Sequence, residues 1–267
     1  MKIRFLFLIV PFLISVGVKA QNQIIPLTNA HAHNDYEHDL PLGDALSHGF
    51  TSVEADVYLI DGELYVYHDK PEIPDPERTL KKLYLEPLQQ RVASGNGSVY
   101  ANYNGFFYLM IDFKTEGKQT YEVLKAQLKP YEEMLSKVVK GKREMDKPVL
   151  IFISGSRPVR QIMKRRAQLV SLDGRPADLR KGIPMEKMPV ISQNYWSISN
   201  WNGEGTIDEG NRSKLIQVIQ LAHSEGKKVR FWAIPDEPNT WKTLIELGVD
   251  FINTDKLSEF RQFILQY

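Results

Sequence analysis

The chain contains no cysteine. Disulfide bonds and a lipid-modified N-terminal cysteine are therefore excluded. It has no internal repeat and no low-complexity tract, and only one long apolar run, near its start. The formal net charge is +1 over 267 residues. Without an excess of positive charge, the composition gives no reason to expect a nucleic-acid partner.

The first twenty residues have the layout of a secretory signal peptide. Lys2 and Arg4 form a short basic region, and the stretch from Phe5 to Val18 is almost wholly apolar. That apolar stretch is short for a membrane span, although an uncleaved anchor is the alternative. We expect residues 1–20 to be a signal peptide, residues 21–267 to form one domain, and the protein to be secreted or periplasmic.

The rest of the chain alternates short apolar runs with amphipathic helical stretches. This order, over roughly 250 residues, predicts an α/β fold, the (β/α)8 TIM barrel. A doubly wound open sheet would need a glycine-rich turn after the first strand, where the sequence is HAHNDY. The expected strands are 24–32, 51–59, 106–113, 148–153, 169–172, 188–193, 228–234 and 250–253, and the main expected helices are 121–138, 157–166, 213–224, 239–247 and 257–266.

Residues 71–105 break this alternation. They are rich in turn-forming residues, follow His68 closely, and carry leucines at the spacing of one short helix. We expect this segment to be a lid that folds over the barrel mouth and lines the substrate channel. The alternative is a helix that packs on the outside of the barrel.

Carboxylates stand at two expected strand ends, where TIM barrels carry their active sites. Glu54 and Asp56 are two residues apart on one strand and therefore point to the same face. Asp112 ends the next barrel strand. Three carboxylates from adjacent strands predict a divalent-cation site, and all-oxygen ligands favour Ca²⁺ or Mg²⁺.

Two histidines flank these carboxylates in the sequence. His33 directly follows the first expected strand, and His68 follows a predicted Asp-Gly hairpin. Histidines so placed can exchange protons with a substrate that the cation holds. Lys114, on the same strand face as Asp112, would meet an anionic oxygen. An E-x-D or His-Asp pair alone is common on solvated surfaces, so it is the joint order of these motifs that favours a phosphodiester-cleaving site.

The same motifs resemble those of the glycerophosphodiester phosphodiesterase and phospholipase C-like phosphodiesterase superfamily, which includes the sphingomyelinase D group. That superfamily shows a histidine after the first strand, E-x-D after the second, and a DG turn followed by HD. In this chain these are His33, Glu54 with Asp56, Asp61-Gly62 and His68-Asp69, and GVDFINTD at 248–255 resembles the last-strand signature.

Some motifs differ from those of the glycerophosphodiesterases. His33-Asn34-Asp35 replaces His-Arg-Gly, PLGD at 41–44 replaces Pro-Glu-Asn-Thr, and Asp112 stands where Glu is usual. The motifs HNDY, VEADV, LYLEPL and IDFK are closer to a branch grouped with a fungal mitochondrial-inheritance protein. The resemblance implies a barrel of the phospholipase C-like phosphodiesterase type. The missing arginine leaves recognition of a glycerophosphate headgroup open.

We therefore expect a metal-dependent phosphodiesterase that acts on glycerophosphodiesters or phospholipid headgroups. Its partners would be a small-molecule or phospholipid phosphodiester and, transiently, a membrane surface, with no nucleic acid. The sequence does not say which histidine is acid and which is base, or whether the product is a hydrolysed or a cyclic phosphate. The expected site residues are His33 and His68 for proton transfer, Glu54, Asp56 and Asp112 for Ca²⁺ or Mg²⁺, and Asn34, Lys114 and Trp232 for substrate.

Two other functions fit the same fold. One is a metal-independent phosphoinositide-cleaving phospholipase, which would need an arginine in place of the cation, and no arginine stands at the ends of the first three expected strands. The other is a barrel that binds phosphorylated lipids or glycans without turnover. The intact pair of histidines disfavours that alternative.

Overall fold

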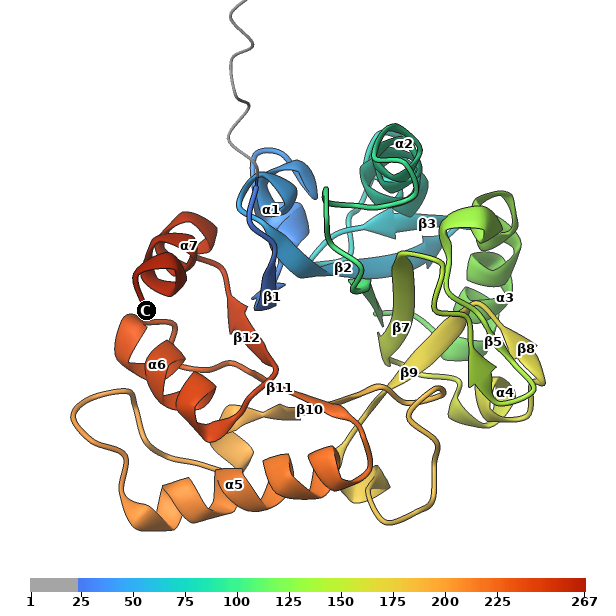
Figure 1. Cartoon of the computed structure of the whole chain (residues 1–267). Coiled ribbons are helices and arrows are strands. Elements are labelled where there is room, and N and C mark those ends of the chain that lie inside the picture. The colour runs from blue at the N-terminus through green and yellow to red at the C-terminus, as the bar shows by residue number, and fades with distance from the viewer. Residues whose placement is uncertain (1–23) are drawn as a thin grey trace, which may run out of the picture.

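Eight strands lie side by side in parallel and close into a ring within residues 24–267, the part of the chain that this computed structural model describes. The ring closes because β1 (Leu27–Ala32) pairs with β12 (Phe251–Thr254) on one side and with β2 (Phe50–Ile60) on the other. Figure 1 looks into this ring. Its other strands are β4 (Phe107–Phe113), β7 (Val149–Gly155), β9 (Val170–Gly174), β10 (Val190–Asn194) and β11 (Lys228–Trp232).

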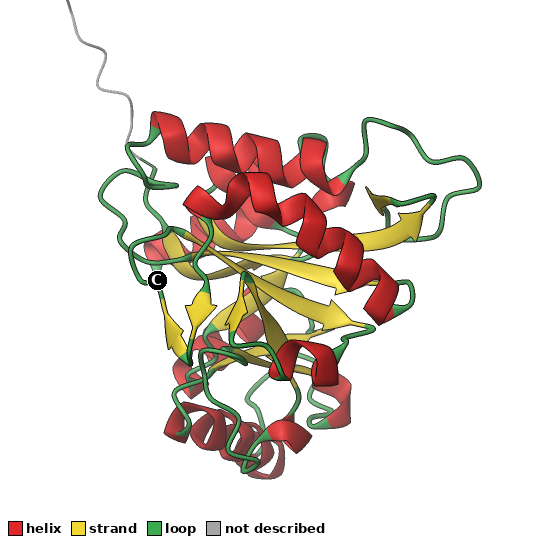
Figure 2. Ribbon diagram, turned by 90° about the vertical axis from the view of Figure 1, so that its right-hand side faces the viewer, coloured by secondary structure: helices red, strands yellow, loops and turns green. Residues whose placement is uncertain are grey.

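Helices connect most of these strands and pack around the outside of the ring (Figure 1). Figure 2, turned by 90°, shows the strands running between them. The predicted (β/α)8 barrel is therefore confirmed. The helices are α1 (Gly43–Ser47), α2 (Glu86–Ser94), α3 (Gly117–Leu128), α4 (Val159–Met163), α5 (Glu209–Ser224), α6 (Pro238–Leu247) and α7 (Leu257–Gln266), with short 3-10 turns at η1 (Asp35–Glu37), η3 (Lys129–Met134), η4 (Pro176–Asp178) and η5 (Tyr195–Ser197).

The predicted hairpin is present beside the ring. β3 (Glu63–Val66) runs antiparallel to β2. Asp61 and Gly62 form the turn between them with positive φ angles of 49° and 84°, the type I′ conformation that an Asp-Gly pair favours. The chain then returns along β2, and the Tyr67 N–H donates to the Asp56 carbonyl at 3.1 Å. This return brings His68 to the carboxyl end of β2.

Successive side chains of each barrel strand alternate between the outer core and the inside of the ring. Val53 and Val57 belong to the large core beneath the helices, whereas Glu54 and Asp56 point inward. Near the carboxyl ends of the strands the inward residues are mainly polar. Deeper inside, the ring is filled by Tyr108, Met110, Leu150, Phe152, Val190 and Phe251.

The helix expected over 121–138 begins and ends four residues earlier than predicted. α3 and η3 end at Met134, and the chain then forms a small three-stranded sheet of β5 (Val138–Val139), β6 (Lys142–Arg143) and β8 (Ala167–Gln168). Two adjacent β-branched valines favour a strand, and Lys140 and Gly141 form a tight turn with positive φ angles of 49° and 81°. The amphipathic pattern of the helix concealed this short hairpin.

The helical part of the segment 71–105 lies on the outside of the ring (Figure 1). It consists of the π-helical turn η2 (Lys81–Leu85) followed by α2. Its apolar side is buried in the outer core through Leu80, Leu85 and Leu88. These helical residues therefore cover the barrel wall and do not fold over the mouth, contrary to the lid expected from the sequence.

The signal peptide predicted for residues 1–20 lies outside the described residues. From residue 24 onward, no helix has the length and apolarity that crossing a membrane requires.

Replacing Phe152 by Ala should destabilise the barrel strongly. Phe152 is completely buried inside the ring and packs edge-on against Tyr108, with ring centroids 6.4 Å apart. Such a truncation typically costs about 3–5 kcal/mol of unfolding free energy. Urea denaturation of Phe152→Ala should show this loss, whereas Ile73→Ala, at a position 88% exposed, should change stability by less than about 0.5 kcal/mol. A loss below about 1 kcal/mol for Phe152→Ala would contradict close packing inside the ring.

Candidate active site

The three predicted carboxylates lie together at the carboxyl ends of β2 and β4. Glu54 and Asp56 share the inward face of β2, and Asp56 is the direct neighbour of Asp112 in the parallel register. One oxygen from each carboxylate lies within 4.8 Å of the others. Glu54 and Asp56 are buried, and Asp112 is mostly buried. Strand pairing thus gathers the trio as the sequence predicted.

Two cations offset part of this negative charge. The Lys114 Nζ is 2.9 Å from Asp56 Oδ2 and 3.3 Å from Asp112 Oδ1. The Arg230 Nη1, from β11, is 3.2 Å from Glu54 Oε2. Burial and the charge of Glu54 raise the pKa of Asp56 to about 6. Burial would also raise the pKa of Glu54, but the positive charge of Arg230 holds it below its ordinary value.

The trio has the chemistry of a hard-cation site. Its donors are all carboxylate oxygens, the ligands that Ca²⁺ and Mg²⁺ prefer. Asp56 Oδ1 is buried and has no hydrogen-bond partner among residues 24–267. A buried carboxylate oxygen without a partner is costly, and a cation beside it would remove that cost. The residues present therefore fit a divalent cation.

His33 faces the trio from the end of β1. Its Nδ1 is 2.9 Å from Asp255 Oδ1, just beyond β12, and its Nε2 is 3.9 Å from Glu54 Oε2. Burial alone would lower the pKa of His33, but the Asp255 hydrogen bond and the Glu54 charge outweigh it and raise the pKa. With Nδ1 donating to Asp255, only Nε2 is left to face the site.

His68 approaches the trio from the other side and is more exposed. Its Nδ1 is 3.9 Å from Asp56 Oδ2 and 3.2 Å from the Tyr36 hydroxyl. That hydroxyl also donates to Asp56 Oδ2 at 2.6 Å. The two predicted histidines therefore flank the same carboxylate trio, and Tyr36 connects one of them to it.

The two other predicted substrate residues lie at the same end of the barrel. Asn34 adopts the left-handed conformation (φ 46°), and its Nδ2 is 3.1 Å from His33 Nδ1. Its Oδ1 lies 2.9 Å from the Tyr36 hydroxyl oxygen. Trp232 ends β11, is 37% exposed, and lies beside Asn194 in the strand register. Neither side chain is part of the carboxylate trio.

A buried network that was not predicted from the sequence lies beneath Glu54. Arg230 Nη1 lies 3.0 Å from His31 Nε2 and 2.8 Å from Asn253 Oδ1. A guanidinium only donates, so His31 Nε2 accepts and His31 Nδ1–H donates to Ser52 Oγ at 2.7 Å. Burial and the charge of Arg230 lower the pKa of His31 to about 4, consistent with a neutral ring. The inward spacing of Lys228, Arg230 and Trp232 on β11 was the signal that could have identified Arg230.

Asp35 anchors the loop that carries His33 and Tyr36. It is fully buried, and its Oδ2 accepts from the Leu42 N–H at 2.6 Å and from the Tyr84 hydroxyl at 2.8 Å. Burial raises the pKa of Asp35 to about 7. The motif HNDY thus contains two residues, Asp35 and Tyr36, whose structural importance the sequence pattern alone did not reveal.

Comparison with known families covers most of the chain. Residues 18–170 match the family model described as the AIM6-like phosphodiesterase domain. Residues 228–258, which include β11 and β12, match the glycerophosphoryl diester phosphodiesterase family. The superfamily resemblance inferred from the motifs is confirmed by both matches.

Similar fungal proteins are named altered inheritance of mitochondria protein 6. The protein from Eremothecium gossypii is 28% identical over 93% of this chain and 72% of its own length. A homolog from Arthroderma benhamiae is 27% identical over 88% of this chain and 83% of its own length. The secreted or periplasmic location predicted from residues 1–20 is contradicted by these relatives, which are named for the inheritance of mitochondria, and that prediction is wrong.

Solved structures share the fold at low sequence identity. A glycerophosphodiester phosphodiesterase from Parabacteroides distasonis superposes with a TM-score of 0.53 at 16% identity, over 91% of this chain and 98% of its own. A phosphodiesterase from Oleispira antarctica, solved with the product sn-glycerol-3-phosphate, also gives 0.53 at 16% identity, over 89% and 97%. These similarities establish a common barrel.

Replacing Asp255 by Asn should lower the pKa of His33. The substitution removes a negative charge 2.9 Å from Nδ1, so the protonated ring loses stabilisation while its burial remains. NMR titration of the histidine ring protons measures this shift. Asp250→Asn is the matched control, because Asp250 contacts His223 instead. An unchanged pKa of His33 in Asp255→Asn would show that Asp255 does not stabilise the protonated ring.

Proposed function

The chain belongs to the AIM6-like phosphodiesterase family, and on this premise we propose that it cleaves phosphodiesters at the barrel mouth with a bound divalent cation. One observation carries the proposal. Two histidines flank a buried trio of carboxylates, and a lysine lies against the same trio. This set contains proton donors and acceptors together with groups that offset negative charge, which phosphoryl transfer requires.

Glu54, Asp56 and Asp112 would hold the cation. Ca²⁺ or Mg²⁺ bound there supplies positive charge to a phosphoryl group. Lys114, whose ammonium lies against Asp56 and Asp112, binds a phosphoryl oxygen from the same side. Burial would lower the pKa of Lys114, but the two carboxylates outweigh this and raise it, so the side chain stays charged.

The two histidines move the protons. An attacking hydroxyl, from water or from the substrate itself, forms a bond to phosphorus while the bond to the leaving alcohol breaks. One histidine takes the proton of the attacking hydroxyl, and the other gives a proton to the leaving oxygen. Asp255 orients His33 so that Nε2 faces the trio, and Tyr36 holds His68 beside Asp56.

We propose glycerophosphodiesters or phospholipid headgroups as substrates. The structural neighbour that holds sn-glycerol-3-phosphate supports a product of this kind. Asn34, beside His33, would contact the polar part of the substrate. Trp232, partly exposed at the end of β11, would cover its apolar part.

A second candidate is metal-independent cleavage on the same barrel. It is favoured by the approach of Arg230 to within 3.2 Å of Glu54, which places a fixed cation in the site together with Lys114. An arginine thus reaches the carboxylates from β11, although none follows the first three barrel strands in the sequence.

Chelation should separate these two candidates. We expect excess chelator to abolish release of glycerol, choline or ethanolamine from a panel of phosphodiesters, and Ca²⁺ or Mg²⁺ to restore it. Chelation should also lower the melting temperature, because the ion binds only the folded protein. Asp112→Asn should weaken both effects. Undiminished turnover in chelator would favour the metal-independent candidate.

Replacing His33 or His68 by Ala should each lower kcat by about 10²–10⁴-fold, the usual contribution of an acid–base group. His38→Ala and His223→Ala are the matched controls and should retain activity. His223 lies on the outer helix α5 and pairs with Asp250. Steady-state kinetics on the same substrate panel measures the effect. A fully active His33 or His68 variant would remove that residue from the mechanism.

A further inference from the structure

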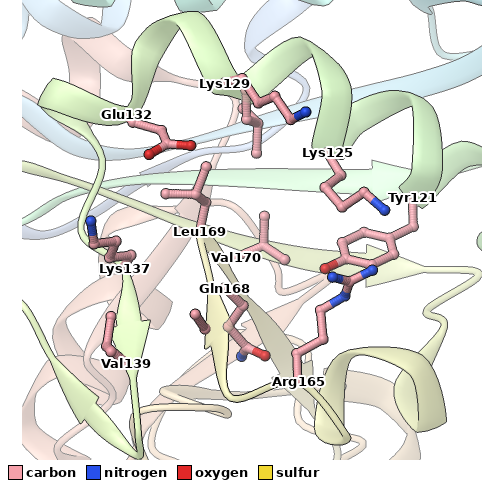
Figure 3. Close-up of a pocket in the computed structure, with 12 residues that line it drawn as sticks. Tyr121, Lys125, Lys129, Glu132, Lys137, Val139, Arg165, Gln168, Leu169 and Val170 are labelled. Atoms are coloured by element: carbon pink, nitrogen blue, oxygen red, sulfur yellow. The ribbon is translucent and has the colours of Figure 1, made fainter.

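Two parts of the barrel's outer surface differ in how they relate to the active site. One is a pocket of about 350 Å³ between α3 with η3 and β8, whose side chains Figure 3 shows. Most of its cationic charge is already offset, because Lys125 and Arg165 pair with Glu122, and Lys137 pairs with Glu144. The other is the segment that contains η2 and α2. Its side chains reach both loops that carry the histidines of the site.

Arg78 lies between these two loops. Its Nη2 donates to the Tyr36 carbonyl at 2.9 Å, in the loop between β1 and α1. Its Nε lies 3.3 Å from the Val66 carbonyl oxygen, and its guanidinium lies over the Tyr67 ring, 4.9 Å from the centroid. Tyr67 directly precedes the second histidine of the site. One planar guanidinium, which donates in fixed directions and stacks on a ring, thus joins the two loops.

Tyr84 holds the loop between β1 and α1 at a second point. It is completely buried and lies on η2, a π-helical turn of the kind found mostly at functional sites. Its hydroxyl donates to Asp35 Oδ2 at 2.8 Å and lies 3.5 Å from the Glu54 carbonyl oxygen. Asp35 Oδ1 has no hydrogen-bond partner in the described part of the chain. This buried carboxylate therefore depends on the Tyr84 hydroxyl and the Leu42 N–H as donors.

The loop between β1 and α1 needs this support because its backbone is strained. Asn34 and Leu42 have positive φ angles of 46° and 61°, which residues other than glycine rarely adopt. Such conformations persist only where the surrounding structure fixes them. The same loop carries Tyr36, whose hydroxyl is 2.6 Å from Asp56 Oδ2 and 3.2 Å from His68 Nδ1. A shift of the loop would therefore change the geometry on both sides of the carboxylate trio.

We propose that Arg78 and Tyr84 are positioning residues, which fix the loop between β1 and α1 against the hairpin of β2 and β3. Arg78 sets the position of the Tyr36 backbone, and Tyr84 sets the position of Asp35. Their effect on the reaction is indirect and rests on the proposed function, in which both histidines act in one step. The segment that contains η2 and α2 thus controls the geometry of the barrel mouth from the barrel wall.

Kinetics of the full chain test this role on the panel of phosphodiesters. Arg78→Ala and Tyr84→Phe should each lower kcat by about 10²-fold, the effect of misplacing catalytic groups by about 1 Å. KM should change much less, because the carboxylates and Lys114 lie on and just after β2 and β4, outside the loop. Arg78→Lys should stay as slow as Arg78→Ala, since an ammonium provides neither the fork nor the flat face of a guanidinium.

Two matched controls come from the same segment. Arg91 also lies over a tyrosine ring, that of Tyr100 at 5.6 Å, and its Nε donates to the Val99 carbonyl at 2.8 Å. The Tyr100 hydroxyl is buried and donates to the Phe50 carbonyl at 2.6 Å. Arg91→Ala and Tyr100→Phe should keep the kcat of the parent even where they lower its melting temperature. A loss of kcat in Arg91→Ala as large as in Arg78→Ala would overturn the proposal.

Hydrogen exchange of residues 33–43, followed by mass spectrometry, tests the positioning without substrate. In Arg78→Ala and Tyr84→Phe this loop should exchange up to about tenfold faster, the factor that one hydrogen bond is worth. Both controls should leave its exchange unchanged. Loop exchange equal to that of the parent in both variants would overturn the positioning role. A parent that cleaves no phosphodiester would overturn the proposed function, whereas faster loop exchange in the two variants would still support the positioning of the loop.

Discussion

The closure of the ring at β1 is the constraint on which the rest of the structure depends. β1 pairs with β2 and β12 at once, so the inward face of one short strand meets residues from both ends of the barrel. His31 thereby contacts Ser52 and Arg230, and His33 lies between Glu54 and Asp255. Without this closure the carboxylates of β2 and β4 would still be neighbours, but neither the buried arginine nor the aspartate that orients His33 would reach them.

Charge inside the ring is arranged as a balance between buried groups. Arg230 and Lys114 approach different members of the trio, so Glu54 stays ionised while burial and like charge raise the pKa of Asp56 to about 6. Neutral His31 accepts from Arg230 and keeps the guanidinium directed at Glu54. One lysine and one arginine side chain thus reduce the repulsion among three acids. Asp56 Oδ1, which has no hydrogen-bond partner within residues 24–267, is the place where a cation would be most effective.

Local patterns predicted the barrel and the trio because both follow from strand periodicity. Glu54 and Asp56 share a face in any extended strand, and the Asp61-Gly62 turn fixes the hairpin that carries His68. Arg230, Tyr36 and Asp35 could not be assigned in the same way, since their roles depend on tertiary pairing between distant segments. The segment 71–105 was assigned to the mouth by its nearness to His68 in sequence. The leucines that suggested a lid are instead buried in the outer core, because the second barrel strand needs a helix to cover it.

The contact between His33 and Asp255 joins positions 222 residues apart. Contacts of such sequence separation form late, because the entropy of closing the intervening chain must be met first. Pairing of β2, β4 and β7 alone would bring the three carboxylates together but would leave His33 without its Asp255 partner. In this protein the orientation of His33 by Asp255 is therefore acquired only when the last strand of the ring has joined the first.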